Sequence, residues 1–184
     1  TLAVERGEAP DAVGEGVRNV HLLAVAPNAS SSIICGNTSP SIEPYRANAF
    51  TQKTKSGSSL LKNEYLEHIL QELGEDTDEV WKSIITNNGS VQHLEFLDEW
   101  TKDVFKTAVE IDQRWIIEMA ADRQKEICQS QSLNIFFPAN VSKQELHAIH
   151  MMAWKKKVKT LYYLRSEAIK RAETVSDEAL RQYI

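Results

Sequence analysis

The sequence has few of the residues from which metal sites, disulfide frameworks and membrane spans are built. It contains 2 cysteines among 184 residues. Cys35 and Cys128 lack the spacing of a metal site or a disulfide framework, and both follow apolar residues, which is typical of a reducing environment. There is neither an apolar stretch long enough to span a bilayer nor a charged-then-apolar leader. We therefore expect a cytoplasmic protein that makes no contact with a membrane.

The chain also lacks an excess of positive charge. Its formal net charge is −5, which argues against a surface for direct nucleic-acid binding. The one basic run, 155–157 with Lys159, is short and suits cations at the C-terminal end of a helix. Hydrophobic residues make up 42% of the sequence, which is enough for a core in a chain that forms one domain or at most two.

The pattern divides the chain into three regions. The first, 1–62, is expected to contain a strand, a hydroxyl-rich turn and a long loop. The second, 63–128, is helical, and the third, 129–184, runs strand, helix and strand before a tail. This order predicts an α/β fold that is rich in helix, in which crossover helices connect parallel strands. Three strands are too few to close a sheet on themselves.

Two features stand out in the first region. The apolar run 21–26 ends at Pro27 and predicts a short strand that is buried on both faces. Residues 36–59 are polar, contain two prolines and several serines, and predict an irregular loop. An ordered loop of this length is usually functional rather than a plain connection.

Apolar residues recur at helical spacing through the second region, and caps and breaks mark the remaining elements. The predicted elements are a helix with its apolar face at 65–73 that ends at Gly74, a helix capped by Asp76 with Glu79 and broken by 87–89, one long helix or two in line from Asp98 to Ala120, a strand over 131–137, a helix opened by Ser142 with Glu145, and a strand over 161–164. Helix should therefore outweigh strand.

Two adjacent tyrosines, Tyr162 and Tyr163, are the most informative pair in the third region. Phenol side chains can lose an electron and a proton together, so neighbouring rings can relay a radical. Consecutive side chains in a regular strand face opposite sides, so the two rings can stack only where the backbone departs from regular extension. The alternative is that one ring packs in the core and the other lies at an interface.

The apolar run of the first region leads into a polar turn, 27–32, at which a helix would begin. Asn28 and the hydroxyls of Ser30 to Ser32 offer donors there, and the first turn of a helix adds unpaired N–H groups and a positive dipole end. Such a site suits a phosphate. The alternative is that these side chains only cap the helix, since the sequence contains no glycine-rich phosphate motif.

Other polar residues give weaker signals. His147 and His150 lie one helical turn apart, but a third ligand does not follow at helical spacing, so we expect packing or surface roles and no metal site. Gln131 and Asn134 lie on a predicted strand, where they either satisfy buried backbone groups or line a site.

Four segments gain meaning when they are taken in order. They are 18–30 (Arg-Asn-Val-His-Leu-Leu-Ala-Val-Ala-Pro-Asn-Ala-Ser), 41–44 (Ser-Ile-Glu-Pro), 131–134 (Gln-Ser-Leu-Asn), and 153–156 (Ala-Trp-Lys-Lys) leading into 161–166 (Leu-Tyr-Tyr-Leu-Arg-Ser). Together they resemble the C-terminal portion of the large, catalytic (alpha) subunit of class I ribonucleotide reductases. Each segment alone is weak, but their order and spacing are specific, and the resemblance covers nearly the whole chain.

The resemblance implies a fold and a reaction. The fold is the C-terminal part of a ten-stranded α/β barrel, and the reaction is the radical-based reduction of a ribonucleoside diphosphate to a deoxyribonucleotide for DNA synthesis. Tyr162 and Tyr163 would be the last radical-transfer residues before an active-site cysteine. The residues that would hold the substrate phosphates are Pro27, Asn28, Ala29, Ser30 and Ser31. Human-like members carry threonine at the position of Asn28.

The same resemblance implies partners and a cofactor held elsewhere. The chain itself would bind no cofactor, and a small (beta) subunit with a di-metal centre and tyrosyl radical would start the chemistry. The other implied partners are the remaining N-terminal part of the alpha subunit, the ribonucleotide substrate, and thioredoxin or glutaredoxin as the reductant. The complete enzyme would bind ATP and be allosteric.

Several family features do not occur in this sequence. They are the catalytic Asn-x-Cys-x-Glu loop, the second cysteine of the reducing pair, the Cys-x-x-Cys-type tail and the allosteric domains. We therefore expect a segment of a longer or split polypeptide that is inactive alone, and neither Cys35 nor Cys128 is assigned as the thiyl residue. Two alternatives remain open. One is a non-catalytic helical binding or assembly fragment left by gene splitting, and the other is part of a cobalamin-dependent reductase, which needs no small subunit.

Overall fold

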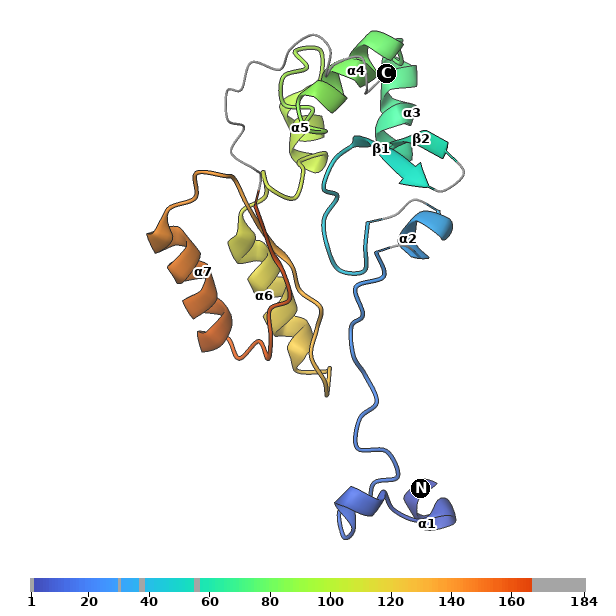
Figure 1. Ribbon diagram of the computed structural model, residues 1–184, viewed down its shortest axis with the longest axis vertical. Helices are drawn as coiled ribbons and strands as arrows, with labels where there is room; N and C mark the ends of the chain where they lie inside the picture. Colours follow the sequence, from blue (N-terminus) through green and yellow to red (C-terminus); the bar gives the residue numbers. More distant parts are fainter. Residues whose placement is uncertain (1, 30, 37–38, 55–56, 167–184) are drawn as a thin grey trace.

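The structure, a computed structural model, describes residues 2–29, 31–36, 39–54 and 57–166. Its main body has two lobes, and the N-terminal segment extends away from them (Figure 1). The N-terminal segment contains α1 (Leu2–Arg6), the 3-10 turn η1 (Pro10–Ala12) and, where it meets the body, α2 (Ser31–Ile34). The hairpin lobe (residues 48–105) contains β1 (Ala49–Thr54), β2 (Gly57–Lys62), α3 (Glu64–Leu73), α4 (Asp78–Thr86) and α5 (Glu99–Val104). The crossover lobe (residues 108–166) contains α6 (Gln113–Gln124), β3 (Ile135–Phe137), α7 (Lys143–Lys155) and β4 (Leu164–Ser166).

The crossover lobe has the predicted order of strand, helix and strand, but its strands are shorter than or shifted from the predicted ones: β3 covers only the end of 131–137, and β4 begins where the strand predicted over 161–164 ends. β3 and β4 pair in parallel, with Ile135 beside Leu164, and α7 connects them. Ser142 caps α7 as expected, because its side-chain oxygen accepts the N–H of Glu145 at 3.0 Å. The buried core of this lobe consists of Ala108, Ile116, Ile117, Ala120, Leu133, Ile135, Phe136, Phe137, Ile149 and Ala153. The core packs β3 against α6, which packs in turn against α7, and so fixes the strand on which the candidate site is built.

The hairpin lobe contradicts the irregular loop predicted over 36–59. β1 and β2 pair antiparallel, from Ala49 beside Lys62 to Thr54 beside Gly57. Phe50 and Leu60 are each more than a third exposed, so the apolar alternation that marks a half-buried strand is weak here. The two strands are held together mainly by backbone hydrogen bonds, which do not show in the pattern of side chains along the sequence.

The predicted cap of α4 also differs in the structure. Thr77, and not Asp76, caps α4, since its hydroxyl accepts the N–H of Val80 at 3.3 Å. Asp76 instead accepts the indole N–H of Trp81 at 2.7 Å. A side chain with a buried tryptophan to satisfy is not free to cap the helix.

The apolar stretch from 98 to 120 forms α5 and α6 with a tight connection between them, rather than one continuous helix. In that connection the carboxylate of Glu110 accepts both the N–H and the hydroxyl of Thr107, at 2.8 and 2.9 Å. Asp112 then caps α6 by accepting the N–H of Arg114 at 3.0 Å. These local side-chain hydrogen bonds offer the backbone an alternative to helix and break it.

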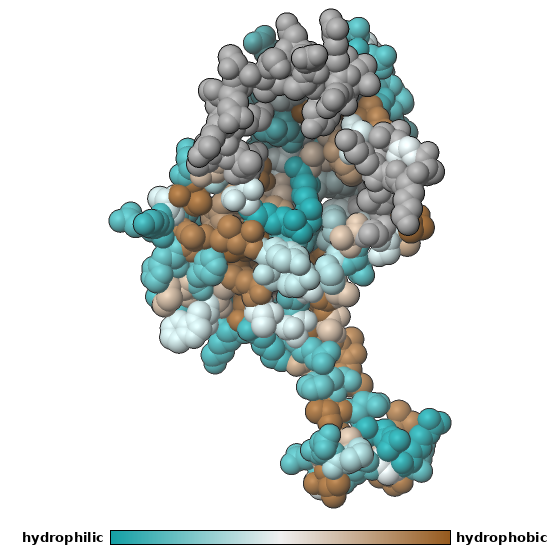
Figure 2. Space-filling model, in the orientation of Figure 1, coloured by the Kyte–Doolittle hydropathy of each residue, from teal (hydrophilic) through white to brown (hydrophobic). Residues whose placement is uncertain are grey.

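The strand predicted over 21–26 is reduced to one bridge, between Val25 and Gln131. It runs parallel to the 129–132 segment, as predicted, but Leu22 and Leu23 are 75% and 55% exposed rather than buried. Figure 2 shows apolar surface along the narrow part of the molecule where the N-terminal segment joins the main body. Among the described residues the segment pairs with a neighbour along one edge only, and the side chains of Leu22 and Leu23 stay exposed.

None of the helices in the described ranges is both long and apolar enough to cross a membrane.

Buried Asn48 joins the hairpin to the helices of its lobe. Its amide nitrogen donates to the carbonyl oxygens of Gly89 and Phe105, at 3.0 and 2.7 Å. Its Oδ1 accepts the amide of Asn63 at 3.0 Å, and Asn63 is the residue that caps α3. One side chain therefore links the hairpin base, the end of α4, the end of α5 and the start of α3.

Asn48→Ala should lower the free energy of unfolding by about 2–3 kcal/mol, because it removes three hydrogen bonds at a buried site. Urea denaturation followed by circular dichroism measures this loss. Asn87→Ala is the matched control, since its amide bonds one exposed carbonyl, that of Ser83, and should change the same quantity by less than about 1 kcal/mol. Equal losses for the two variants would contradict the linking role of Asn48.

Candidate functional site

The two tyrosines that the sequence singles out lie against each other. The ring centroids of Tyr162 and Tyr163 are 4.1 Å apart, with planes inclined at 48°. The Tyr162 hydroxyl donates to the Tyr163 oxygen at 3.4 Å, and this bond is the main cause that raises the pKa of Tyr162 above its ordinary value. Both side chains are about half exposed. The two rings are therefore in contact rather than separated, in a tilted and not a parallel-stacked arrangement.

A cation lies over one of these rings. The guanidinium carbon of Arg165, two residues further along the chain, is 4.9 Å from the centroid of the Tyr163 ring. This distance is within the range of a cation–π contact. The contact adds to the restraints on the Tyr163 ring while leaving its hydroxyl oriented toward Tyr162.

The backbone departs from a regular ladder at the tyrosine pair. In a parallel ladder, one residue both donates to and accepts from the neighbouring strand. Here the two bonds are divided: Tyr162 N–H donates to Leu133 at 2.8 Å, whereas Tyr163 accepts from Ile135 N–H at 3.0 Å. One extra residue is thus accommodated on the tyrosine side, as in a bulge. This irregularity is what allows consecutive rings to meet.

The N–H of Tyr163 that this irregularity leaves over is taken by a side chain. Asn134 Oδ1 accepts it at 2.9 Å. The Nδ2 of Asn134 donates in turn to Oε1 of Glu43, whose other oxygen lies 3.4 Å from the guanidinium of Arg46. Segments 41–44, 131–134 and 161–166, which the sequence marks separately, therefore meet in one chain of hydrogen bonds.

The structure settles the two interpretations of the strand amides. Gln131 satisfies buried backbone, since its amide donates to the carbonyl of Ala120 at 2.8 Å. Asn134 does the same for Tyr163 and also supports the candidate site. Both residues are buried. His150 bonds the carbonyl of Leu146 within its own helix, and no group of three His, Cys, Asp or Glu residues within the described ranges could hold a metal ion.

The predicted phosphate-binding turn is an exposed turn ahead of a very short helix. Pro27, Asn28, Ala29 and Ser31 are all exposed, and Ser30 lies outside the described residues. Asn28 has φ +45°, a left-handed conformation that asparagine tolerates better than most residues. The Ser31 hydroxyl donates to the Asn28 carbonyl at 3.4 Å. The turn follows directly on the segment that bridges to Gln131.

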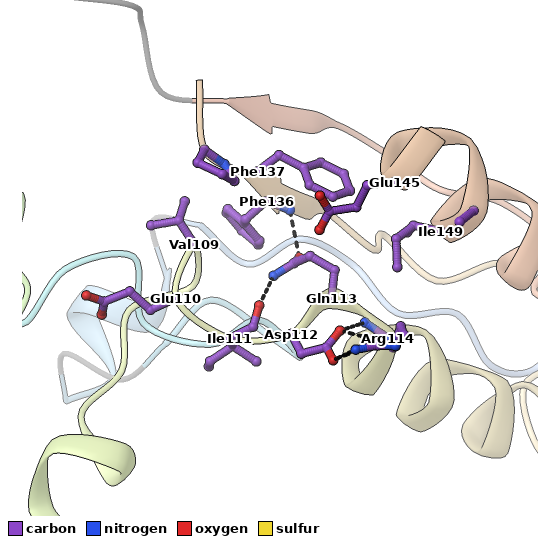
Figure 3. A pocket seen from close by; sticks show the side chains of 12 residues that line it. Val109, Glu110, Ile111, Asp112, Gln113, Arg114, Phe136, Phe137, Glu145 and Ile149 are labelled. Atoms are coloured by element: carbon purple, nitrogen blue, oxygen red, sulfur yellow. Dashed lines mark hydrogen bonds and ion pairs between the residues drawn. The ribbon is translucent and has the colours of Figure 1, made fainter. Parts of the chain in front are cut away.

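A pocket of about 480 Å³ lies at the carboxyl end of β3, between the start of α6 and α7 (Figure 3). None of the site residues predicted from the sequence lines it. At its centre the buried amide of Gln113 donates to the carbonyls of Ile111 and Ala108, at 2.6 and 2.9 Å, and accepts the N–H of Phe136 at 2.8 Å. These bonds connect α6 to β3. The sequence does not reveal this role, because Gln113 lies within the stretch that predicts a long helix.

Cys128 is exposed, as is Cys35, rather than enclosed by apolar residues. The backbone N–H groups of Leu23 and Leu22 donate to its sulfur, at 3.1 and 3.0 Å. These two bonds, first that from Leu23, lower the pKa of Cys128 because they stabilise the thiolate. The thiol therefore ties the N-terminal segment to the connection between α6 and β3.

The lowered pKa predicts unusually fast alkylation of Cys128 at neutral pH, since the thiolate is the reactive form. We expect the pH midpoint of its iodoacetamide labelling to lie below about 8.5, the value for an unperturbed thiol. Mass spectrometry of the peptide that contains Cys128 measures the rate at each pH. Labelling of the urea-unfolded chain is the control and should return to the ordinary midpoint, and a midpoint that does not change on unfolding would contradict the prediction.

Comparisons with known proteins agree on one family. The family described as ribonucleotide reductase, barrel domain, matches residues 9–164. The chain is 56% identical over 175 residues to the ribonucleoside-diphosphate reductase large subunit of Invertebrate iridescent virus 6, covering 93% of this chain and 18% of that protein. It is 52% identical over 167 residues to the large subunit of Invertebrate iridescent virus 3, covering 89% and 26%.

A solved structure matches as well. The alpha subunit of the Actinobacillus ureae class Id ribonucleotide reductase superposes with a TM-score of 0.78 at 42% sequence identity. The match covers 91% of this chain and 30% of that chain. The chain thus spans less than a third of each of these proteins.

Proposed function

Because the chain belongs to the ribonucleotide reductase family, as a segment of the large-subunit barrel domain, we propose that it serves the radical-based reduction of ribonucleoside diphosphates to deoxyribonucleotides. In the complete subunit its parallel strands would be part of a ten-stranded barrel. The observation that carries the proposal is the contact between Tyr162 and Tyr163, whose hydroxyl oxygens are 3.4 Å apart.

Transfer of a single hydrogen atom between the two tyrosines moves the radical from one ring to the other, and no other atom is gained or lost. A phenoxyl radical on Tyr163 takes a hydrogen atom, one proton and one electron, from the hydroxyl of Tyr162. The O–H bond of Tyr162 breaks, an O–H bond forms on Tyr163, and the radical is then on Tyr162. The 3.4 Å separation of the two hydroxyl oxygens supports a direct transfer between them. The pair would thus pass the radical toward an active-site cysteine outside this chain.

The turn formed by Pro27, Asn28, Ala29, Ser30 and Ser31 would hold the substrate phosphates. Its place supports this role, since it follows the carboxyl end of a segment that runs parallel to its neighbour, and ligands of parallel α/β folds bind at such ends. Its exposure supports it too. Because α2 has only four residues, backbone and hydroxyl donors would contribute more than a helix dipole.

Several partners complete the proposal. The remaining part of the alpha subunit would supply the catalytic cysteine, and a small subunit with a di-metal centre and tyrosyl radical would supply the oxidising equivalent. Thioredoxin or glutaredoxin would return the reducing electrons. We propose a cytoplasmic location, and this chain's own residues would carry the phosphate site and the radical relay.

Reconstitution tests the proposed function. The 184-residue chain is combined with the remaining part of the alpha subunit and the small subunit from the same source, and reduction of a ribonucleoside diphosphate is measured with a dithiol reductant. We expect turnover only when all three components are present. Turnover with cobalamin and without the small subunit would overturn the radical relay, and an assembled complex without turnover would leave the chain as an assembly fragment.

A further inference from the structure

We propose that Asn134 is a positioning residue for the tyrosine pair and that buried Glu43 holds its amide in the orientation this requires. The inference rests on the radical relay proposed above and extends it to residues that touch neither a substrate nor the reacting hydroxyls. Its basis is the chain of hydrogen bonds from Glu43 through Asn134 to the Tyr163 backbone.

The first step in the argument is the extra residue at the start of β4. A regular register would have Tyr163 N–H donate to the Leu133 carbonyl, the same acceptor that Tyr162 N–H occupies at 2.8 Å. The Tyr163 N–H therefore needs another acceptor, and Asn134 Oδ1 provides it at 2.9 Å. Without that acceptor, the irregular backbone that brings the rings together would contain an unpaired N–H group.

The second step is the orientation of the amide. The two ends of an asparagine side chain differ, since the oxygen accepts and the nitrogen donates. If the Asn134 amide were reversed, its NH₂ group would face the Tyr163 N–H, and its oxygen would face the Glu43 carboxylate. Both contacts would be repulsive. The Glu43 oxygen thus selects the one orientation in which Asn134 can serve Tyr163.

The third step is burial. Asn134 is 2% exposed and the Glu43 side chain is also 2% exposed. Water cannot readily replace either partner at such a depth, so a lost hydrogen bond stays unmade. The hydroxyls of the tyrosine pair, by contrast, belong to side chains that are about half exposed. Asn134 and Glu43 are therefore held firmly enough to set the position of the more exposed tyrosine pair.

An exchange of the two buried groups tests the inference. Asn134→Asp places two carboxylates face to face and should break the chain of bonds. Adding Glu43→Gln restores it with the roles reversed, because the new glutamine donates to one aspartate oxygen while the other accepts from Tyr163 N–H. Glu43→Gln alone keeps an acceptor for Asn134 and is the matched control. Asn134→Ser shortens the side chain without adding charge.

The readout is the proximity of the rings. The 184-residue chain is labelled with 3-fluorotyrosine, and fluorine NMR measures cross-relaxation between the labels at 162 and 163, assigned with single Tyr→Phe variants. Far-UV circular dichroism confirms folding. We expect the signal in the wild type and Glu43→Gln, its loss in Asn134→Asp and Asn134→Ser, and its return in the exchanged double variant.

Unchanged cross-relaxation in a folded Asn134→Asp or Asn134→Ser variant would overturn the inference. A folded double variant without the signal would do so as well, and so would failure of every Asn134 variant to fold, because Asn134 would then serve the fold rather than the pair. In the reconstituted enzyme we expect kcat to fall about tenfold or more in Asn134→Ser with KM for the nucleotide unchanged. Loss of cross-relaxation in Asn134→Ser with no turnover even for the wild type would refute the proposed function alone.

Discussion

Tyr163→Phe should reduce turnover of the reconstituted enzyme by more than about a hundredfold, equivalent to about 2.7 kcal/mol of barrier. Phenylalanine has no O–H bond, so it can neither give up nor receive the hydrogen atom that moves between the two rings. The ring itself remains, and so does its contact with the guanidinium of Arg165. The side chain is about half exposed and its hydroxyl bonds only the neighbouring phenol among the described contacts.

The fold should therefore be nearly unaffected, with the free energy of unfolding changed by less than about 0.5 kcal/mol. Steady-state reduction of the nucleotide and urea denaturation measure the two effects separately. Tyr65→Phe is the control, because it also removes one hydroxyl from an exposed tyrosine, on α3, and should leave turnover unchanged. Turnover of Tyr163→Phe close to that of the control would remove the relay from the mechanism.

The largest loss of stability is expected for Gly89→Ala, which should lower the free energy of unfolding by more than about 3 kcal/mol. Gly89 has φ +82°, and a left-handed conformation costs an alanine about 1–2 kcal/mol. The added Cβ would also lie 2.2 Å from Ala47 Cβ and 2.5 Å from Ala47 Cα. Relief of that overlap must move the backbone beside Asn48, whose N–H and amide both bond the Gly89 carbonyl.

Gly74→Ala separates the two causes. Gly74 ends α3 with φ +74°, but a Cβ there would meet nothing within 4 Å. This variant should therefore lose only the conformational term, about 1–2 kcal/mol. Thermal or urea unfolding of both variants gives the difference directly. Similar losses at the two positions would mean that the contact with Ala47 relaxes at little cost.

Much of the crossover lobe, and the end of α3 in the hairpin lobe, were predictable because their signals are local and strong. Ser142 and Glu145 mark the start of α7 by a capping pattern, and the structure confirms that Ser142 is the cap. Apolar residues mark the strand that includes Phe136 and Phe137, which the structure buries. Gly74 ends α3 in a left-handed conformation, as its place after an amphipathic face predicts. In each case the residues that form the element also make the contacts that stabilise it.

Other elements depend on contacts that the pattern of residues along the chain does not show. The 21–26 run is apolar, but whether a strand is buried depends on what covers it, and here Leu22 and Leu23 are open. The hairpin of β1 and β2 owes its pairing to backbone groups, which every residue carries. Asp76 matches a helix cap in sequence, but the indole of Trp81 takes its carboxylate.

The candidate site was predictable in part. The tyrosine pair could be identified from two adjacent letters, and the need for an irregular backbone followed from strand geometry. The hydrogen bond that satisfies the N–H left over by that irregularity, from Tyr163 to Asn134, joins residues 29 positions apart and could not be derived from spacing. Glu43, 91 positions from Asn134, was visible only as part of a family segment.

Within the described residues, the buried side chains of each of the two core clusters come from one continuous stretch of chain. The buried residues of the hairpin lobe fall between 49 and 105, and those of the crossover lobe fall between 108 and 153. Cores of such low contact order can form and open as separate cooperative units. A cut between 105 and 108 would therefore leave two pieces, each with its own core. Glu43 would remain on one piece and Asn134 on the other, so the bond that supports the tyrosine pair would also rejoin the halves.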